Sequence, residues 1–466
     1  MLSDNDDDKQ PEQDAGAARA EPVQEQRIKH DHDWRKRARV EFSDRALWTG
    51  RVVVVAMAVL AGLTVVGFTW LCEQAFDVFE QLRLIAWWSP LIWTPACTAA
   101  AVWLTRRFAP GAAGSGIPQV MAALEPSLDP GKRGLFVSLR LSVAKVLFTA
   151  GGLLGGLSLG REGPSVQIAA GVMLQARRLL PARSHVTTHS LLVAGGAAGI
   201  AAAFNTPLAG IMFAIEELAR APEQRNSGLI ITAIVLGGLI AVSVHGNATY
   251  FGVIHSGAIG TGLLLPGLVV ALCTGLAGGL FSRLLIASLA GQGRDPMSRL
   301  RASRPVLFGA VCGLAVALIG LVTAGATFGS GYGPTRAMVD GVATMPMVYA
   351  LFKFLATWFS SWAGVPAGIF APSLAIGAAM GNDVALLFFH GQAPALIALG
   401  MVGFLAAATQ APLTAFIIVM EMVDGHSMVL SLMACALVAS VLARIISPPL
   451  YPTLARLQLQ RAAPAA

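Results

Sequence analysis

An arginine and a glutamate stand side by side within an apolar part of the chain, at Arg161 and Glu162. The run from Leu141 to Met173 around them consists largely of Gly, Leu, Val and Ala. A charged side chain in hydrocarbon costs about 3 kcal/mol and usually marks a functional site. Glycine and proline flank the pair within residues 160–164, so the same segment also predicts a break in the helix. We interpret the charge and the break as one functional device.

Glu162 has the chemistry of a combined gate and proton carrier. An ionised carboxylate aimed at an anion site competes with the anion, whereas a protonated carboxyl releases the site. One movement of this side chain would therefore couple anion passage to proton transfer. A buried ion pair with Arg161 is the structural alternative, but neighbours on a helix diverge by about 100° and rarely pair.

A second acidic pair, Glu216 and Glu217, ends a later apolar segment. Because intramembrane carboxylates commonly form proton paths, one of the two is predicted to relay protons between the cytoplasm and Glu162. The alternative is a solvated helix end, which fits at least one of them. Lys145, in the same apolar run as Glu162, is expected to be a structural counter-ion for a carboxylate.

Two hydroxyl groups could add hydrogen-bond donors to an anion site. Ser115 lies in a Gly-Ser-Gly-Ile-Pro segment, and Tyr451, one of only four tyrosines, lies in Pro-Pro-Leu-Tyr-Pro. The structural alternatives are a serine that caps only its own helix and a tyrosine in an aromatic belt at the membrane surface.

The elements that would position these side chains are helices that start inside the membrane. A helix N-terminus carries about half a positive charge and up to four unpaired N–H groups. Several converging N-termini would hold an anion weakly enough to release it, unlike a lysine or an arginine. Three segments predict such starts, with proline early in each helix. Their break residues are Gly114, Gly116 and Pro118; Gly160, Gly163 and Pro164; and Gly368 and Pro372.

The break segments recur in two halves of the chain. Segment 160–164 corresponds to segment 368–372 at an offset of 208 residues, and a segment ending at Glu216 corresponds to one ending at Glu421 at an offset of 205. Repeated halves with matching breaks indicate a transporter whose site lies where the halves meet. The alternative is a shared bias toward small residues in packed helices. The repeat itself leaves open whether the halves are parallel or inverted.

Composition indicates a polytopic membrane protein. The 466 residues are 55% hydrophobic and 13% charged, with a mean hydropathy of +0.65, whereas an average soluble protein is about a quarter charged. Several apolar runs are too short or too interrupted to cross the bilayer as one straight helix, which predicts broken helices around an internal site. The runs cover residues 50–74, 84–104, 134–160, 164–180, 190–218, 227–245, 262–290, 304–325, 346–362, 368–389, 394–422 and 427–446.

The chain ends are polar. Residues 1–46 predict a disordered cytoplasmic tail. The basic residues cluster just before the first apolar run, so anchoring of a cytoplasmic segment explains the net charge of +7 better than nucleic-acid binding does. Arginines near both ends favour two cytoplasmic termini. We expect membrane repeats over 47–252 and 253–446, and a C-terminal helix with a cytoplasmic tail over 447–466.

No cofactor, metal site or enzymatic activity is indicated. The eight histidines show no metal-ligand spacing, and the five cysteines are irregularly spaced in apolar segments. A phosphate-binding Gly-x-x-x-x-Gly-Lys motif does not occur in the sequence, which leaves transport driven by ATP unsupported.

Three motifs, in this order, resemble the signature of the CLC chloride channels and proton-coupled chloride transporters. They are Gly-Ser-Gly-Ile-Pro at 114–118, Gly-Arg-Glu-Gly-Pro at 160–164 and Gly-Ile-Phe-Ala-Pro at 368–372. The resemblance covers the chain from residue 50 to residue 457. It implies an all-α polytopic fold of two inverted-topology repeats of tilted, broken helices. It also implies a homodimer in a bacterial inner membrane, with one anion pathway in each subunit.

The resemblance also assigns roles to single residues. The implied ligands of a central chloride are Ser115, Tyr451 and the backbone amides of Ile369 and Phe370. Glu162 is similar to the family's external gating and proton glutamate, and Glu217 to the internal proton site of the transporter branch. In this family the residue at the position of Ser115 selects between chloride and nitrate, and a serine there favours chloride. The segment after the first motif departs from relatives at Gln119 and Met121, where acids are frequent, so a salt bridge from there to Lys145 is not carried over.

The expected function is the exchange of chloride for protons across the membrane. One alternative is a passive voltage- or pH-gated chloride channel with the same pore, and channel members usually lack an acid at the position of Glu217. A non-transporting membrane scaffold is the alternative from another class. A scaffold would have no reason to keep Glu162 in an apolar run.

Overall fold

Helices form nearly every regular element of the chain, as expected for apolar segments that must satisfy their own backbone hydrogen bonds. The computed structural model describes residues 45–182, 184–219, 227–246, 249–254, 261–291, 293, 295–342, 344–388 and 393–462. In these ranges the only extended pairings are two isolated bridges, Gly114 with Pro366 and Gly160 with Gly368. The predicted cytoplasmic tail over 1–46 lies outside the described residues apart from its last two positions, which begin the first described helix.

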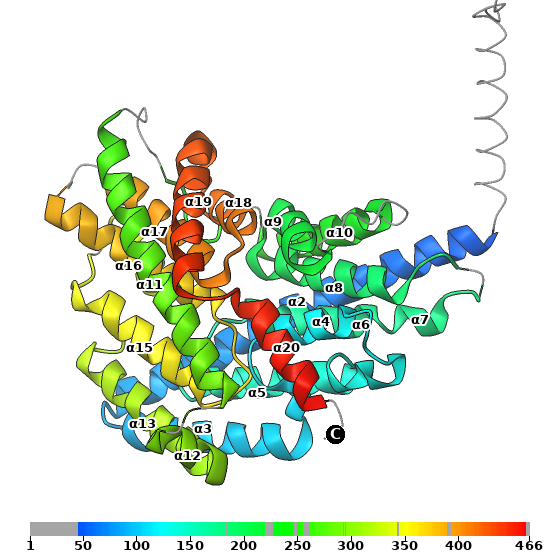
Figure 1. The fold of residues 1–466 in the computed structure, drawn as a ribbon, viewed down its shortest axis with the longest axis horizontal. Helices are drawn as coiled ribbons and strands as arrows, with labels where there is room; N and C mark the ends of the chain where they lie inside the picture. Colours follow the sequence, from blue (N-terminus) through cyan, green and yellow to red (C-terminus); the bar gives the residue numbers. More distant parts are fainter. Residues whose placement is uncertain are drawn as a thin grey trace, which may run out of the picture. The chain divides into compact units, whose positions relative to one another are not determined.

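The two halves contain corresponding helices in the same order (Figure 1). The first half has α2 (Arg45–Ile85), α3 (Pro90–Phe108), α4 (Ile117–Leu124), α5 (Leu139–Leu154), α6 (Glu162–Met173), the short α7 (Ala176–Leu179), α8 (Thr188–Phe204), α9 (Pro207–Phe213) and α10 (Ser227–His245). The second has α11 (Leu264–Ala290), the short α12 (Pro296–Ser303), α13 (Pro305–Val322), α14 (Tyr332–Val339), α15 (Val348–Trp362), α16 (Phe370–Phe388), α17 (Ala393–Thr409), α18 (Pro412–Met422) and α19 (Val429–Ile446). The last helix, α20 (Leu450–Ala462), follows the second half.

Helix lengths agree with the prediction of interrupted spans. Six described helical segments are long and apolar enough to cross a membrane, and four further apolar helices, including α8 and α17, are shorter. The first helix is longer than its apolar run over 50–74 and continues to Ile85 with charged residues on exposed and half-buried positions. Glu80 and Arg83 form an ion pair one turn apart there, at 2.6 Å, which is compatible with helix.

Reciprocal contacts relate the two halves by a two-fold axis. The carboxylate of Glu216 accepts hydrogen bonds from the backbone N–H groups of Leu413 and Thr414, at 3.1 and 2.7 Å, at the start of α18. Glu421 in turn accepts from Leu208 and Ala209 at the start of α9, at 3.2 and 2.8 Å. Mutual contacts of this kind arise when two equivalent units face each other across a two-fold axis. Corresponding helices of the two halves therefore face each other, as expected for a fold of two repeats.

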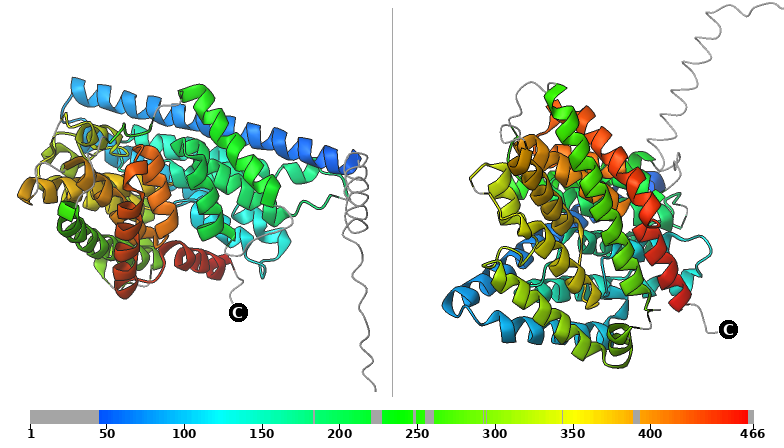
Figure 2. Two further views of the ribbon diagram at one scale, coloured as in Figure 1. Left: turned by 90° about the horizontal axis from the view of Figure 1, so that it is seen from above. Right: turned by 60° about the vertical axis from the view of Figure 1, so that its left-hand side comes forward.

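The same relation is visible at the break segments. Gly160 and Gly368 exchange two backbone hydrogen bonds, at 2.7 and 2.9 Å, and their bridge is antiparallel. Helices α6 and α16 start beside this bridge and run away from it in opposite directions (Figure 1). Figure 2 shows the two groups of helices from two further directions.

Local sequence explains a second pair of matched breaks. Helix α8 ends before Asn205 and α17 ends before Gln410, and both residues have left-handed backbone, with φ of 59° and 61°. Pro207 and Pro412 then begin the next helices, where a missing N–H costs nothing. Each of the expected apolar runs over 190–218 and 394–422 is thus divided into two helices, a division that the sequence analysis did not predict.

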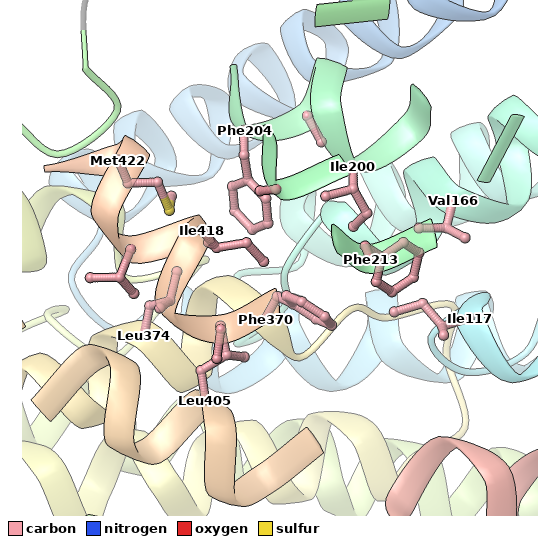
Figure 3. Packing of buried hydrophobic residues seen from close by; sticks show 14 of the residues in the cluster. Ile117, Val166, Ile200, Phe204, Phe213, Phe370, Leu374, Leu405, Ile418 and Met422 are labelled. Atoms are coloured by element: carbon pink, nitrogen blue, oxygen red, sulfur yellow. The ribbon is translucent and has the colours of Figure 1, made fainter. Parts of the chain in front are cut away.

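Large apolar side chains fill the space where the halves meet. Figure 3 shows Phe204, Phe213 and Phe370 among aliphatic residues of both halves, such as Ile117 and Ile418. The rings of Phe204 and Phe370 lie 6.2 Å apart. This core holds the starts of α4, α6 and α16 in fixed positions.

Replacing Glu421 with alanine should destabilise the protein, because two backbone N–H groups at the start of α9 lose a charged acceptor. We expect a loss of about 1–2 kcal/mol in the free energy of unfolding. The melting temperature of the detergent-solubilised protein measures it. Glu125→Ala is the control, since Glu125 is exposed and, within the described residues, its carboxylate accepts a hydrogen bond only from Ser127, at 3.4 Å. Equal effects of the two substitutions would contradict the capping role.

Candidate functional site

The three predicted helix starts converge. The backbone of Gly114 bonds to Val365 and Ala367, at 3.2 and 3.1 Å, in the segment that precedes α16. A Cβ atom on Gly163 would collide with Ser115 Oγ and lie 3.4 Å from the Cα of Gly368. Only glycine permits this approach of three backbones. The starts of α4, α6 and α16 therefore form one site, as the sequence predicted.

Proline occupies an early position in each of these helices. Pro118 is the second residue of α4, Pro164 the third of α6 and Pro372 the third of α16. Gly116, with φ of 110°, precedes α4 and packs so closely against the backbone of Gly163 that a Cβ atom would not fit. The first N–H groups of the helices thus remain directed toward their common centre.

The carboxylate of Glu162 lies at the start of α16. Its Oε2 accepts a hydrogen bond from the N–H of Ala371 at 3.4 Å, and the residue is fully buried. A Cβ atom on Gly160 would collide with this carboxylate, so the glycine provides its space. The side chain therefore occupies the position in which helix N–H groups would attract an anion. Ile369 and Phe370, the other residues at this helix start, are buried beside it.

Ser115 and Tyr451 lie together in the site although they come from opposite ends of the chain. Both hydroxyl groups are buried and lack a hydrogen-bond partner among the described residues. The Ser115 and Tyr451 hydroxyl groups lie close to each other. The Tyr451 ring stacks on Phe370, with centroids 6.1 Å apart and planes at 13°. Two buried hydroxyls with unused donors are suited to an anion.

The second acidic pair is divided by a change in the helix. After α9 the chain forms a π-helical turn over Ala214–Ala219, a rare element that is frequent at functional sites. Glu216 points to the start of α18, where it caps the helix. Glu217 is buried, and both it and Glu162 lie near enough to Tyr451 to act electrostatically on its hydroxyl. The sequence left a solvated helix end as the alternative for at least one acid, but Glu216 caps another helix instead. The proton-relay role of Glu217 stays a prediction.

Lys145 does not serve as a counter-ion for a carboxylate, and that expectation is wrong. Its ammonium group donates to the carbonyl oxygens of Ala112 and Gly114, at 2.8 and 2.6 Å. The sequence gives no sign of these partners, because backbone carbonyls are present at every position. Lys145 instead fixes the turn that presents Ser115.

A second buried lysine does the same in the other half, and sequence analysis missed it. Lys353 in α15 donates to the carbonyl oxygens of Thr327 and Gly329, at 3.0 and 2.8 Å, before α14. The two lysines are separated by 208 residues, the offset of the repeat, which could have identified the pair.

Arg161 also has partners that the sequence does not reveal. Its guanidinium donates to Glu73 of α2 at 2.7 Å and to the hydroxyl of Tyr250 at 3.1 Å, and it stacks over the Tyr250 ring. The prediction that Arg161 and Glu162 do not pair directly is confirmed by this arrangement. Arg161 ties the segment before α6 to α2 and to the connection between the halves.

A cavity of about 520 Å³ leads to Ser115. Its lining comes from the segments around α4 and α5 and from the last helix, and includes Gly114, Ser115, Pro118 and Arg461. The site is therefore approached from the side on which α20 ends. No group of three His, Cys, Asp or Glu side chains in the described ranges could hold a metal ion.

Known proteins resemble this chain over most of its length. Residues 97–444 match the family described as voltage gated chloride channel. The H(+)/Cl(-) exchange transporter ClcA of Cronobacter sakazakii is 32% identical over 423 residues, which are 85% of this chain and 87% of the relative. The protein of that name from Klebsiella pneumoniae is 31% identical over 426 residues, or 86% and 87%.

Solved structures show the same fold. A slow cyanobacterial Cl-/H+ antiporter superposes with a TM-score of 0.77 at 25% identity, covering 89% of this chain and 98% of the other. A CLC-type fluoride/proton antiporter superposes with a TM-score of 0.71 at 22% identity, covering 88% and 98%. The second match bears on the fold alone.

Substituting either buried lysine should separate structural from binding effects. Lys145→Met and Lys353→Met each leave two carbonyls without a donor, so both should lower the melting temperature. Only Lys145 fixes the turn of Ser115, and we expect its substitution to weaken chloride binding about tenfold, equal to about 1.4 kcal/mol. Isothermal titration calorimetry with chloride measures this. Equal loss of chloride affinity in Lys353→Met would contradict the specific role of Lys145.

Proposed function

Because the chain belongs to the voltage gated chloride channel family, we propose that it is a membrane antiporter that exchanges chloride for protons. The observation that carries the proposal is the position of the Glu162 carboxylate at the start of α16. A carboxyl group in an anion position can bind a proton and also compete with chloride, so it links the movement of the two ions. The names of the ClcA relatives and of the cyanobacterial antiporter agree with exchange.

Chloride would be held by partial charges. The N–H groups of Ile369 and Phe370 stand at the positive end of α16, and the hydroxyls of Ser115 and Tyr451 are buried with free donors. These groups stabilise an anion without a full positive charge, so chloride can also leave. Chloride that enters from the cavity displaces the ionised side chain of Glu162 from the same N–H groups.

Protons would reach Glu162 through the interior. Among the described residues of the first half, Glu217 is the second buried carboxyl group, and Tyr451 lies within electrostatic range of both acids. When Glu162 receives a proton, it loses its attraction to the helix start and releases the site to an anion. Glu217 supplies that proton from the side of the cavity. A passive channel has no need of Glu217.

The remaining features of the proposal concern the surroundings of the protein. We place it in a bacterial inner membrane with both termini in the cytoplasm, in keeping with the arginines at both ends. The family resemblance favours a homodimer with a pathway in each subunit, which the mass of the detergent-solubilised protein tests. Its cargo is chloride and protons, without a cofactor or nucleic acid.

Purified protein in liposomes under a chloride gradient should move protons against their own gradient. The reason is that each passage of chloride requires Glu162 to leave and rebind, with a proton exchanged in the cycle. A pH electrode and a chloride electrode record the two fluxes together. Chloride flux without proton movement would show a channel. Fluxes no larger than those of protein-free liposomes would exclude both a channel and an antiporter.

Two glutamine substitutions should each stop proton transport while chloride flux continues. Glu162→Gln removes the charge that competes with chloride, so chloride flux should continue while proton movement falls to background. Glu217→Gln should also abolish proton transport yet keep chloride flux, because Glu162 remains in place. Glu216→Gln is the matched control, since it alters the neighbouring acid that caps α18. Intact coupling in Glu217→Gln would disprove the proposed proton route.

A further inference from the structure

Three arginines from separate helices line one small cavity. Arg106 comes from the end of α3, Arg301 from α12 and Arg461 from the end of α20. The cavity has a volume of about 320 Å³, and Gly291, Ser298 and Ala302 complete its described lining. It therefore gathers three positive charges and one hydroxyl around a space with room for several water-sized groups.

Backbone carbonyls hold two of the guanidinium groups in place. Arg301 donates to the carbonyl of Ser288 at 2.7 Å, and Arg461 donates to Leu289 and Ala290 at 2.7 and 3.1 Å. These carbonyls belong to the last turn of α11, whose negative end attracts cations. A guanidinium has five N–H donors, so most remain available after these bonds.

The three charges are not neutralised by the described part of the chain. None of them forms an ion pair there, and the exposed Asp295 instead caps the start of α12 through Ser298, at 2.9 Å. Burial, together with the positive charges of Arg461 and Arg106, lowers the pKa of Arg301. Mutual repulsion of like charges destabilises the free cavity, and an anion would relieve it.

The arginine cavity adjoins the route to the anion site. Arg301 and Arg461 also line the larger cavity that reaches Ser115. Arg461 is ten residues beyond Tyr451 on the single helix α20, which spans roughly 15 Å over that distance. A charge bound at the arginines would therefore change the electrostatic potential at the mouth of the chloride pathway.

We infer that Arg106, Arg301 and Arg461 form a binding site for a phosphate group, and that the bound phosphate slows the movement of chloride through the larger cavity. The regulatory part of this inference rests on the proposed function. Planar guanidinium groups match the oxygens of phosphate in pairs, whereas a halide offers no such geometry. A halide held by three guanidiniums would also leave too slowly for a transport step. The phosphate comes either from a soluble metabolite or from a lipid headgroup.

Binding is tested first on the detergent-solubilised full chain. Calorimetric titration with inorganic phosphate in chloride-free buffer should show saturable binding. Arg301→Gln and Arg461→Gln should each raise the Kd about tenfold, since a charge-assisted pair is lost. Arg299→Gln is the matched control, because Arg299 is exposed on the same helix and does not line the cavity. Arg461→Lys, which keeps the charge, should lose less affinity than Arg461→Gln.

Transport assays separate the two sources of phosphate. Inorganic phosphate should lower chloride flux in phosphatidylcholine liposomes if the ligand is soluble, and added phosphatidic acid should lower it if the ligand is a lipid. Either effect should disappear in Arg301→Gln, with each variant compared to its own phosphate-free rate. Unchanged flux with both probes would overturn the regulatory role.

The binding measurement does not depend on transport. Absence of saturable phosphate binding in the titration, or a Kd that neither arginine substitution changes, would overturn the site. If the chain failed to exchange chloride for protons, the calorimetric result would still decide whether the site exists. Failure of this inference and failure of the proposed function are thus distinguishable.

Discussion

The contact between Gly160 and Gly368 is the constraint on which the rest of the structure depends. Two backbone hydrogen bonds join these glycines, and a Cβ atom on Gly368 would lie 2.7 Å from the carbonyl oxygen of Gly160. Helices that start within a membrane expose N–H groups that hydrocarbon cannot satisfy. The glycine bridge places two such starts together, so one polar centre satisfies both. Side chains that extend into this centre, such as Glu162, then determine its chemistry.

The two halves share an architecture but differ in chemistry. Both keep a glycine and proline break, a lysine that holds a preceding turn, and a glutamate that caps a helix of the other half. Where the first half has Arg161 and Glu162, the second has Ile369 and Phe370. The second half thus contributes backbone donors and an aromatic surface. At this position the first half contributes a charged pair instead.

Much of this arrangement follows from the sequence, and the exceptions have a physical reason. Proline and glycine act on their own neighbours, so the breaks at segments 160–164 and 368–372 could be predicted locally. Partners of Lys145 and Arg161 depend on which distant backbone or side chain comes within reach, and no local pattern records that. The π-helical turn that separates Glu216 from Glu217 likewise reflects tertiary packing rather than residue preference.

The exchange of caps between Glu216 and Glu421 has a consequence for biosynthesis. Each glutamate completes a helix of the other half, and Glu421 lies near the end of the chain. While the ribosome is still producing the second half, these N–H groups of α9 lack the acceptor that they have in the folded protein. The start of α9 therefore completes its native hydrogen bonds only after Glu421 has been synthesised.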